Sequence, residues 1–153
     1  MKFSHIDEAG QARMVDVSAK PVIHRTATAE GKIYCAPETV KLIQDNQIKK
    51  GDVLTTANIA GVIGAKQTST LIPLCHNIGI DQAVLSLEVE EDGVRITAKT
   101  VCTDKTGIEM EALTAVSVAA LTVYDMCKAV DKKMRIGDIH LVEKTKTPVT
   151  VQG

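Results

Sequence analysis

Aromatic side chains are scarce in this chain of 153 residues, which contains two Tyr, one Phe and no Trp. A core built without aromatics must rely on Val, Ile, Leu, Ala and Met, and the length suffices for one domain with a real core. The same scarcity argues against a platform on which the bases of single-stranded nucleic acid stack. We therefore expect a single aliphatic domain over residues 1–153.

An excess of positive charge is also missing. The formal net charge is −1, and the lysines are dispersed among acids. The long-range field that non-specific binding to nucleic acid requires is therefore absent. A compact anionic ligand held by a few lysines is compatible with this composition, so a small-molecule partner is expected rather than nucleic acid.

Paired cysteines are absent as well. The sequence has no C-x-x-C motif, and its four cysteines lie far apart, at Cys35, Cys75, Cys102 and Cys127. This spacing argues against a structural zinc. The polar start MKFSHIDEAGQAR does not resemble a secretory signal, so reduced thiols and a cytoplasmic location are expected. The longest apolar run, residues 112–124, is too short for a membrane span.

Turn residues and hydrophobic periodicity divide the chain into elements. Pro37 suits the first position of a helix, and Asp52 can cap the next one. Asp92-Gly93 is a tight-turn sequence inside a stretch of period two, which predicts a hairpin. Gly31 predicts a bulge or bend within a strand. The predicted elements are strands at 14–18 and 22–36, helices at 37–48 and 52–66, a hairpin at 80–103, a helix at 107–130 and a strand at 136–145.

This order of elements, β-β-α-α-β-β-α-β, favours an α+β fold. Helices would pack on one face of a mainly antiparallel sheet. The arrangement leaves the two ends of the longest helix as the places where charged groups gather.

The helix GIEMEALTAVSVAALTVYDMCKAV, residues 107–130, carries charge only near its ends. Thr106 to Glu109 matches a capping box, which would explain Glu109 structurally. Lys105 lies beside the helix start, where free N–H groups attract anions. Asp125 and Lys128 are either a surface ion pair or a proton-transfer pair in which partial burial lowers the pKa of the lysine.

The distance between the two charged ends is the next constraint. Glu111 and Asp125 are fourteen residues apart, about 21 Å along a helix and on nearly the same face. One site cannot easily use both from one helix. A copy packed antiparallel around a two-fold axis near Val118 would bring Glu111 of one chain to Asp125 and Lys128 of the other. The small residues expected to permit this approach are Ala115, Ser117, Ala119 and Ala120.

Two further stretches carry candidate residues. In LIPLCHN, residues 71–77, Cys75 and His76 are adjacent and therefore point apart, which argues against a Cys–His dyad. His76 is the better candidate for a ligand-binding residue, as a hydrogen-bond donor to an anionic or polar ligand. Cys75 is interpreted as a small apolar residue in the wall of the site. In KKGD, Lys49 and Lys50 lie either on a solvated turn or against a phosphate.

Several long segments together resemble one known family. They are MVDVSAK at 14–20, KKGDV at 49–53, IAG at 59–61, LIPLCHN at 71–77 and KTGIEMEALTAVSVAALTVYDMCKAV at 105–130. In collinear order over nearly the whole chain, they resemble the molybdenum cofactor biosynthesis protein C family, the cyclic pyranopterin monophosphate synthases. The resemblance implies a ferredoxin-like α+β fold and a homohexamer built as a trimer of dimers, with sites at subunit interfaces.

The activity that the resemblance implies is that of a lyase. Its substrate would be (8S)-3′,8-cyclo-7,8-dihydroguanosine 5′-triphosphate, made from GTP by an upstream radical enzyme, and its products cyclic pyranopterin monophosphate and pyrophosphate. No cofactor and no metal are implied. Position by position, the family's catalytic residues match Asp125, Lys128 and Lys50, and its substrate-binding residues match Leu74, Cys75, His76, Met110 and Glu111.

These residue types suit that chemistry. Repeated proton transfers need a carboxylate and a lysine held close together, and loss of pyrophosphate needs positive charge from Lys50 with Lys66 or Lys105. One departure concerns the C-terminal end, where relatives often carry a Gly-Lys-Ser-Gly type segment. This chain reads EKTKTPVTVQG, so Lys144 or Lys146 would have to substitute.

Two other function classes compete with the enzyme. A binding module for an anionic nucleotide would use the lysines and His76 but would not need Asp125. A purely structural oligomer would explain the apolar helix but not the charges at both of its ends.

Overall fold

The computed structural model describes residues 6–149, which form four strands and three helices in the order β-α-α-β-β-α-β. The elements are β1 (Ile23–Tyr34), α1 (Pro37–Gln44), α2 (Val53–Leu71), β2 (Ile80–Glu90), β3 (Gly93–Asp104), α3 (Glu109–Cys127) and β4 (Arg135–Thr147).

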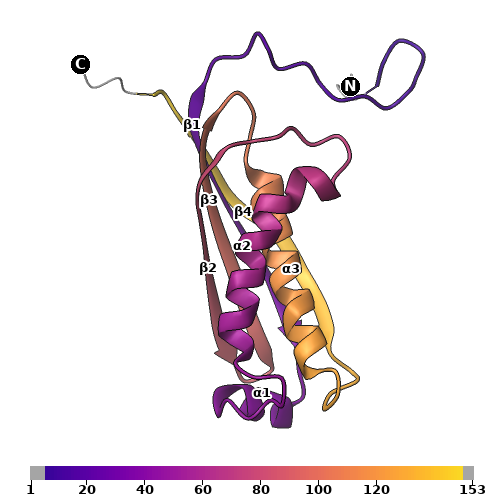
Figure 1. The fold of residues 1–153 in the computed structure, drawn as a ribbon, viewed down its shortest axis with the longest axis vertical. Helices are drawn as coiled ribbons and strands as arrows, with labels where there is room; N and C mark the ends of the chain where they lie inside the picture. Colours follow the sequence, from indigo (N-terminus) through magenta and orange to yellow (C-terminus); the bar gives the residue numbers. More distant parts are fainter. Residues whose placement is uncertain (1–5, 150–153) are drawn as a thin grey trace.

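The four strands form one antiparallel sheet in the order β2-β3-β1-β4. The helices α2 and α3 lie side by side on one face of it, and the short helix α1 lies beyond their lower ends (Figure 1). This is the ferredoxin-like α+β arrangement that the sequence predicts.

The central strand β1 alternates between the helix layer and the open face of the sheet. Ala27, Ala29 and Ile33 are buried toward the helices. The pairing of β1 with β4 shifts register beside Gly31, but the extra residue lies in β4, where Asp138 and Ile139 together face Gly31, and β1 itself stays in register with β3. The bulge expected within β1 is therefore found in the neighbouring strand. A side chain at Gly31 would meet Val116 of α3 at 2.7 Å, which explains why only glycine fits there.

The uncharged middle of α3 is covered within the same chain. Its sheet side packs on β1 and β3, and its flank lies against α2. Gly61 and Gly64 of α2 make room for this contact, because a side chain at Gly64 would lie 2.7 Å from Val118. Ten of the nineteen residues of α3 are buried. The helix is therefore apolar because the sheet and α2 together enclose it.

This packing corrects the expectation that small residues of α3 face a second copy. Ala115, Ala119 and Ala120 are fully buried inside their own chain, and only Ser117 of that set is partly exposed. By length and hydropathy alone α3 resembles a membrane span, yet 56% of that window is buried within the fold, as in the core helix of a globular protein.

Some element boundaries differ from the predicted ones, because contacts with side chains far away in the sequence set where these elements begin and end. Residues 14–18 form no strand, because side chains of the site engage the carbonyl oxygens of Val15 and Ser18. Helix α1 ends four residues early, and α2 continues five residues past the predicted end at Lys66. Asp52 caps α2 as predicted, with its carboxylate accepting from the Thr55 N–H at 3.0 Å.

The hairpin is confirmed, with its turn one residue earlier than expected. Glu90 pairs with Gly93, so the turn residues are Glu91 and Asp92. Gly93 is needed for another reason, since a Cβ there would collide with the carbonyl oxygen of Ile33.

The close contact between α2 and α3 predicts the effect of Gly64→Val. The added side chain overlaps Val118, so we expect a loss of about 1–3 kcal/mol in the free energy of unfolding, measured by urea denaturation. Gly79→Val is the control, because no heavy atom lies within 4 Å of a Cβ at Gly79. Equal stability of the Gly64 variant and the wild type would contradict this packing.

Candidate active site

Three of the predicted residues meet at the C-terminal end of α3. The Lys50 ammonium lies 2.8 Å from Asp125 Oδ2 and 3.1 Å from the Asp125 carbonyl oxygen. The Lys128 ammonium lies 2.8 Å from Asp125 Oδ1. We call Lys50, Asp125 and Lys128 the charged cluster. Each carboxylate oxygen of Asp125 therefore binds one lysine, and the three side chains remain about half exposed.

Local structure explains how these side chains meet. Asp125 and Lys128 are three apart, so they are neighbours on one helix face. Lys50 comes from the turn between α1 and α2, where the Gly51 N–H donates to the Ile48 carbonyl at 2.9 Å and Gly51 has φ +108°. Ile48 is buried and anchors this turn.

The charged cluster shifts the pKa values of its members. Hydrogen bonds from Lys128 and then Lys50 lower the pKa of Asp125 to about 2. The hydrogen bond to Asp125 raises the pKa of Lys128. The expectation of a lysine pKa lowered by burial is therefore wrong for this chain, because the Lys128 side chain is 57% exposed and paired with a carboxylate.

All five predicted substrate-binding residues line one cavity at the opposite end of α3. This cavity, which we call the His76 cavity, has a volume of about 170 Å³. Its walls come from the segment after α2 and from the first turn of α3. They include Leu74, Cys75, His76, Met110 and Glu111.

Glu111 has an unusual environment within the His76 cavity. Its side chain is 3% exposed, and its Oε2 has no hydrogen-bond partner among the described residues. Burial raises the pKa of Glu111 to about 7, with a further increase from the charge of Glu109. A carboxyl group with such a pKa can gain or lose a proton near neutrality.

His76 and Cys75 both line the cavity, and the role of His76 toward a ligand stays a prediction. The His76 Nε2–H donates to the Val15 carbonyl at 2.5 Å, which holds residues 14–18 over this end of the molecule. Burial raises the pKa of the Cys75 thiol, and the nearby Glu111 adds to the effect. The thiol is therefore protonated at neutral pH and forms a wall of the cavity rather than a nucleophile.

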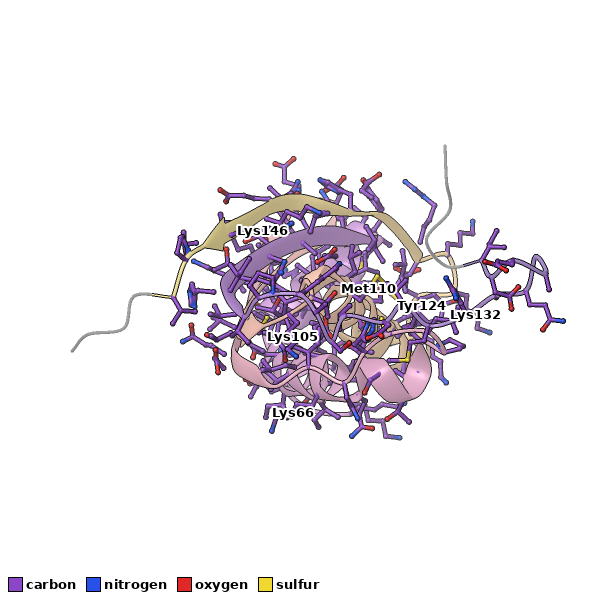
Figure 2. The ribbon with its side chains drawn as sticks, turned by 90° about the horizontal axis from the view of Figure 1, so that it is seen from above. Lys66, Lys105, Met110, Tyr124, Lys132 and Lys146 are labelled. Atoms are coloured by element: carbon purple, nitrogen blue, oxygen red, sulfur yellow. The ribbon has the colours of Figure 1, made fainter. Side chains whose placement is uncertain are left out.

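A second cavity adjoins the His76 cavity and is strongly basic. This basic cavity has a volume of about 390 Å³, and both cavities are lined by Thr106, Gly107 and Glu109. In Figure 2, which looks down the long axis, Lys146 lies on the outer strand β4 and Lys66 on the α2 side. Lys66 lines a different cavity, beside β2. The cationic residues of the basic cavity are Lys20, Arg25, Lys105, Lys144 and Lys146.

Sequence reasoning missed Lys20 and Arg25. Arg25 is buried, and it donates to the carbonyl oxygens of Asp104 and Lys105 at 3.1 Å each. The sequence does contain a sign of this role. Alternation along β1 places Arg25 on the same inward face as Ala27 and Ala29, and it is the one charged residue at these inward positions. Lys20 stands in an irregular segment that carries no pattern.

The predicted capping box is wrong. The N-cap of α3 is Ile108, with no hydrogen bond from a capping side chain. Thr106 precedes the helix and lines both cavities. Among residues 6–149, no group of three or more His, Cys, Asp or Glu side chains is placed to hold a metal ion.

Comparison with known proteins identifies the family. The sequence model of the MoaC family matches residues 14–147. The chain belongs to the MoaC family. It is 54% identical over 145 residues to the cyclic pyranopterin monophosphate synthase of Peptoclostridium acidaminophilum, covering 95% of this chain and 92% of the relative. It is 56% identical over 146 residues to the synthase of Desulfitobacterium hafniense, covering 95% and 90%.

A longer MoaC relative is a molybdenum cofactor biosynthesis bifunctional protein of Chlorobaculum tepidum. It is 52% identical over 145 residues, which cover 95% of this chain and 46% of the relative. Membership of the MoaC family makes the chain an enzyme of molybdenum cofactor biosynthesis.

The raised pKa of Glu111 predicts how stability depends on pH. The folded pKa of about 7 exceeds the ordinary value of 4.5, so the native state binds this proton more tightly and stability falls as pH rises between these values. Ionisation of Glu111 should lower the free energy of unfolding by at most about 3 kcal/mol over this pH range. Glu111→Gln cannot ionise, so we expect this pH-dependent loss of stability to disappear in the variant. Urea unfolding from pH 4.5 to 8 measures it, and parallel stability curves for the two proteins would contradict it.

Proposed function

We propose that this protein converts (8S)-3′,8-cyclo-7,8-dihydroguanosine 5′-triphosphate into cyclic pyranopterin monophosphate and releases pyrophosphate. The observation that carries the proposal is the grouping of eight residues in a member of the MoaC family. Lys50, Asp125 and Lys128 meet at one end of α3. The five expected substrate-binding residues line one cavity at the other end.

The charged cluster suits the proton transfers of this rearrangement. Opening the imidazole ring of the guanine and closing the pterin ring require protons to be both removed and supplied. At neutral pH the lowered pKa of Asp125 and the raised pKa of Lys128 leave the carboxylate ionised and the lysine protonated. In this resting state Lys128 holds a proton and Asp125 has none, and efficient transfer requires bound substrate to bring both pKa values closer to neutrality.

The basic cavity suits the triphosphate. Lys105, Lys144 and Lys146 come from the start of α3 and from β4, and they converge on the same cavity. Their charge would stabilise the phosphate oxygens and the departing pyrophosphate. Lys144 and Lys146 thus supply the cations that the C-terminal segment of relatives would otherwise provide.

A complete site requires a second copy of the chain. The charged cluster and the His76 cavity lie at opposite ends of α3, about 21 Å apart for fourteen residues of helix. A two-fold arrangement would place the cluster of one chain beside the cavity of the other. Exposed apolar side chains on the outer helix layer supply a surface for it, at Ile59, Ile63 and Leu121. We therefore propose a dimer, with the hexamer as a trimer of such dimers.

The bifunctional relative supports a place in the same pathway. Its name joins a chain like this one to a second activity of molybdenum cofactor biosynthesis. We infer a functional link to the radical enzyme that supplies the cyclised substrate.

The cysteines support a cytoplasmic location. All four are unpaired and three of them are buried, which fits a reducing compartment.

Turnover tests the proposed chemistry directly. With the cyclised GTP intermediate, we expect the wild type to release pyrophosphate and to form a pterin that fluoresces after oxidation. Asp125→Asn and Lys128→Ala should each lower kcat by about 10²- to 10⁴-fold, because each removes a proton-transfer group.

Lys132→Ala is the matched control, since Lys132 is an exposed lysine four residues beyond Lys128. It should keep wild-type turnover. A wild type that binds the intermediate without turnover would instead favour the binding module, and full activity of Asp125→Asn would refute the role of the charged cluster.

Mixing variants tests the shared site. His76→Ala and Lys128→Ala damage opposite ends of α3, so each homo-oligomer should be inactive. After denaturation and refolding together, random pairing gives hybrid dimers in which one site holds both intact halves, and about a quarter of wild-type activity should return. Refolding each variant alone is the control. No recovery from a mixture shown to contain hybrids would mean that each site lies within one chain.

A further inference from the structure

Asp131 is a buried acid that the proposed chemistry does not use. It stands four residues after the end of α3 and is 6% exposed. Unlike Glu111, it is fully hydrogen-bonded. Its Oδ2 accepts from the Ala36 N–H at 2.8 Å and from the Thr39 hydroxyl at 3.0 Å, and its Oδ1 accepts from the Lys133 N–H at 3.0 Å.

These contacts make Asp131 the cap of a distant helix. The N-cap residue of α1 is Ala36, whose side chain cannot accept a hydrogen bond. Asp131, which lies 95 residues further along the chain, instead accepts from the Ala36 N–H and from the Thr39 hydroxyl of the first turn. Its negative charge also suits the positive end of the helix dipole. The start of α1 is thereby tied to the segment that follows α3.

The same short helix leads to Lys50. After α1, the turn that contains buried Ile48 delivers Lys50 to Asp125. Asp131 itself is fixed to α3, because its N–H donates to the Cys127 carbonyl at 3.1 Å. Helix α1 is therefore joined to the end of α3 at two points, before it by Asp131 and after it by Lys50. In Figure 1 α1 lies at the end of the molecule, beyond the lower ends of α2 and α3.

We propose that Asp131 is a positioning residue for the charged cluster. By capping α1 it sets where Lys50 stands relative to Asp125 and Lys128, which lie just before it in the chain. The reaction assigned to these three groups is the proposed function above, and this inference rests on it. Because small displacements of reacting groups are costly, losing the cap should slow the chemistry more than it weakens substrate binding.

The test compares Asp131→Ala with Asp131→Asn in the oligomer, with rates taken per folded site. Alanine removes all three hydrogen bonds, so we expect kcat to fall by about 10- to 100-fold while KM stays within about threefold. The amide oxygen of asparagine can still accept from Ala36 and Thr39, so Asp131→Asn should return kcat to within about fivefold of the wild type.

Ile96→Ala is the stability control. Ile96 is fully buried in β3, so its truncation lowers stability without touching the cluster, and kcat per folded site should not change.

A second experiment needs no substrate. It measures by mass spectrometry the rates at which an amine reagent labels individual lysines. We expect Lys50 and Lys128 to label at least about threefold faster in Asp131→Ala, with exposed Lys132 unchanged as the internal reference.

The two readouts separate this inference from the proposed function. If the wild type turns over and Asp131→Ala has the same kcat, the role of Asp131 is refuted. Labelling rates of Lys50 and Lys128 that do not change in Asp131→Ala would refute it as well. A wild type without turnover would overturn the proposed function alone, and the labelling rates would still decide whether Asp131 positions the cluster.

Discussion

The close packing of α3 between the sheet and α2 is the constraint on which the rest of the structure depends. Gly61 and Gly64 let α2 approach so closely that most of the middle of α3 is buried against α2 and the sheet, with Leu121 left on its outer side. Charged side chains cannot occupy that middle without a large desolvation cost. They gather instead at the two ends of the helix, which separates the charged cluster from the His76 cavity. The separation of the charged cluster from the His76 cavity is thus a consequence of core packing.

The same helix produces opposite ionisation at its two ends. Glu111 lies buried in the first turn of α3, where its Oε2 has no hydrogen-bond partner among residues 6–149, and its pKa rises. Asp125 ends α3 in a half-exposed place between two lysines, and its pKa falls. Two carboxylates of ordinary chemistry therefore differ in pKa by environment alone. A site that joins both ends across two chains would combine a carboxyl able to exchange protons near neutrality with one that stays ionised.

The sequence predicts the elements that local pattern controls and misjudges those that tertiary contacts decide. Strand β1, the hairpin and α3 all follow from periodicity and turn residues, whereas the bulge beside Gly31 lies in β4. Residues 14–18 have strand composition, but His76 and Lys105 engage their carbonyl oxygens. The alanines of α3 looked available to a partner, although α2 and the sheet cover them. The pKa of Lys128 is raised by its hydrogen bond to Asp125, and the exposure that keeps burial from lowering it is not visible in the sequence.

The residues of the charged cluster can be predicted from the sequence, but the residue that supports the cluster cannot, because it acts through long-range hydrogen bonds. A motif marks Asp125 and Lys128 because they are three residues apart, and Lys50 because it stands in KKGD. Asp131 acts on Ala36 across 95 residues, and no pattern within either segment signals that contact. A buried carboxylate whose Oδ2 accepts two hydrogen bonds at the start of another helix has an architectural role that only the fold discloses. Asp131 joins the two elements that carry the charged cluster, so under the proposed function the same hydrogen bonds would hold the fold together and align the chemistry.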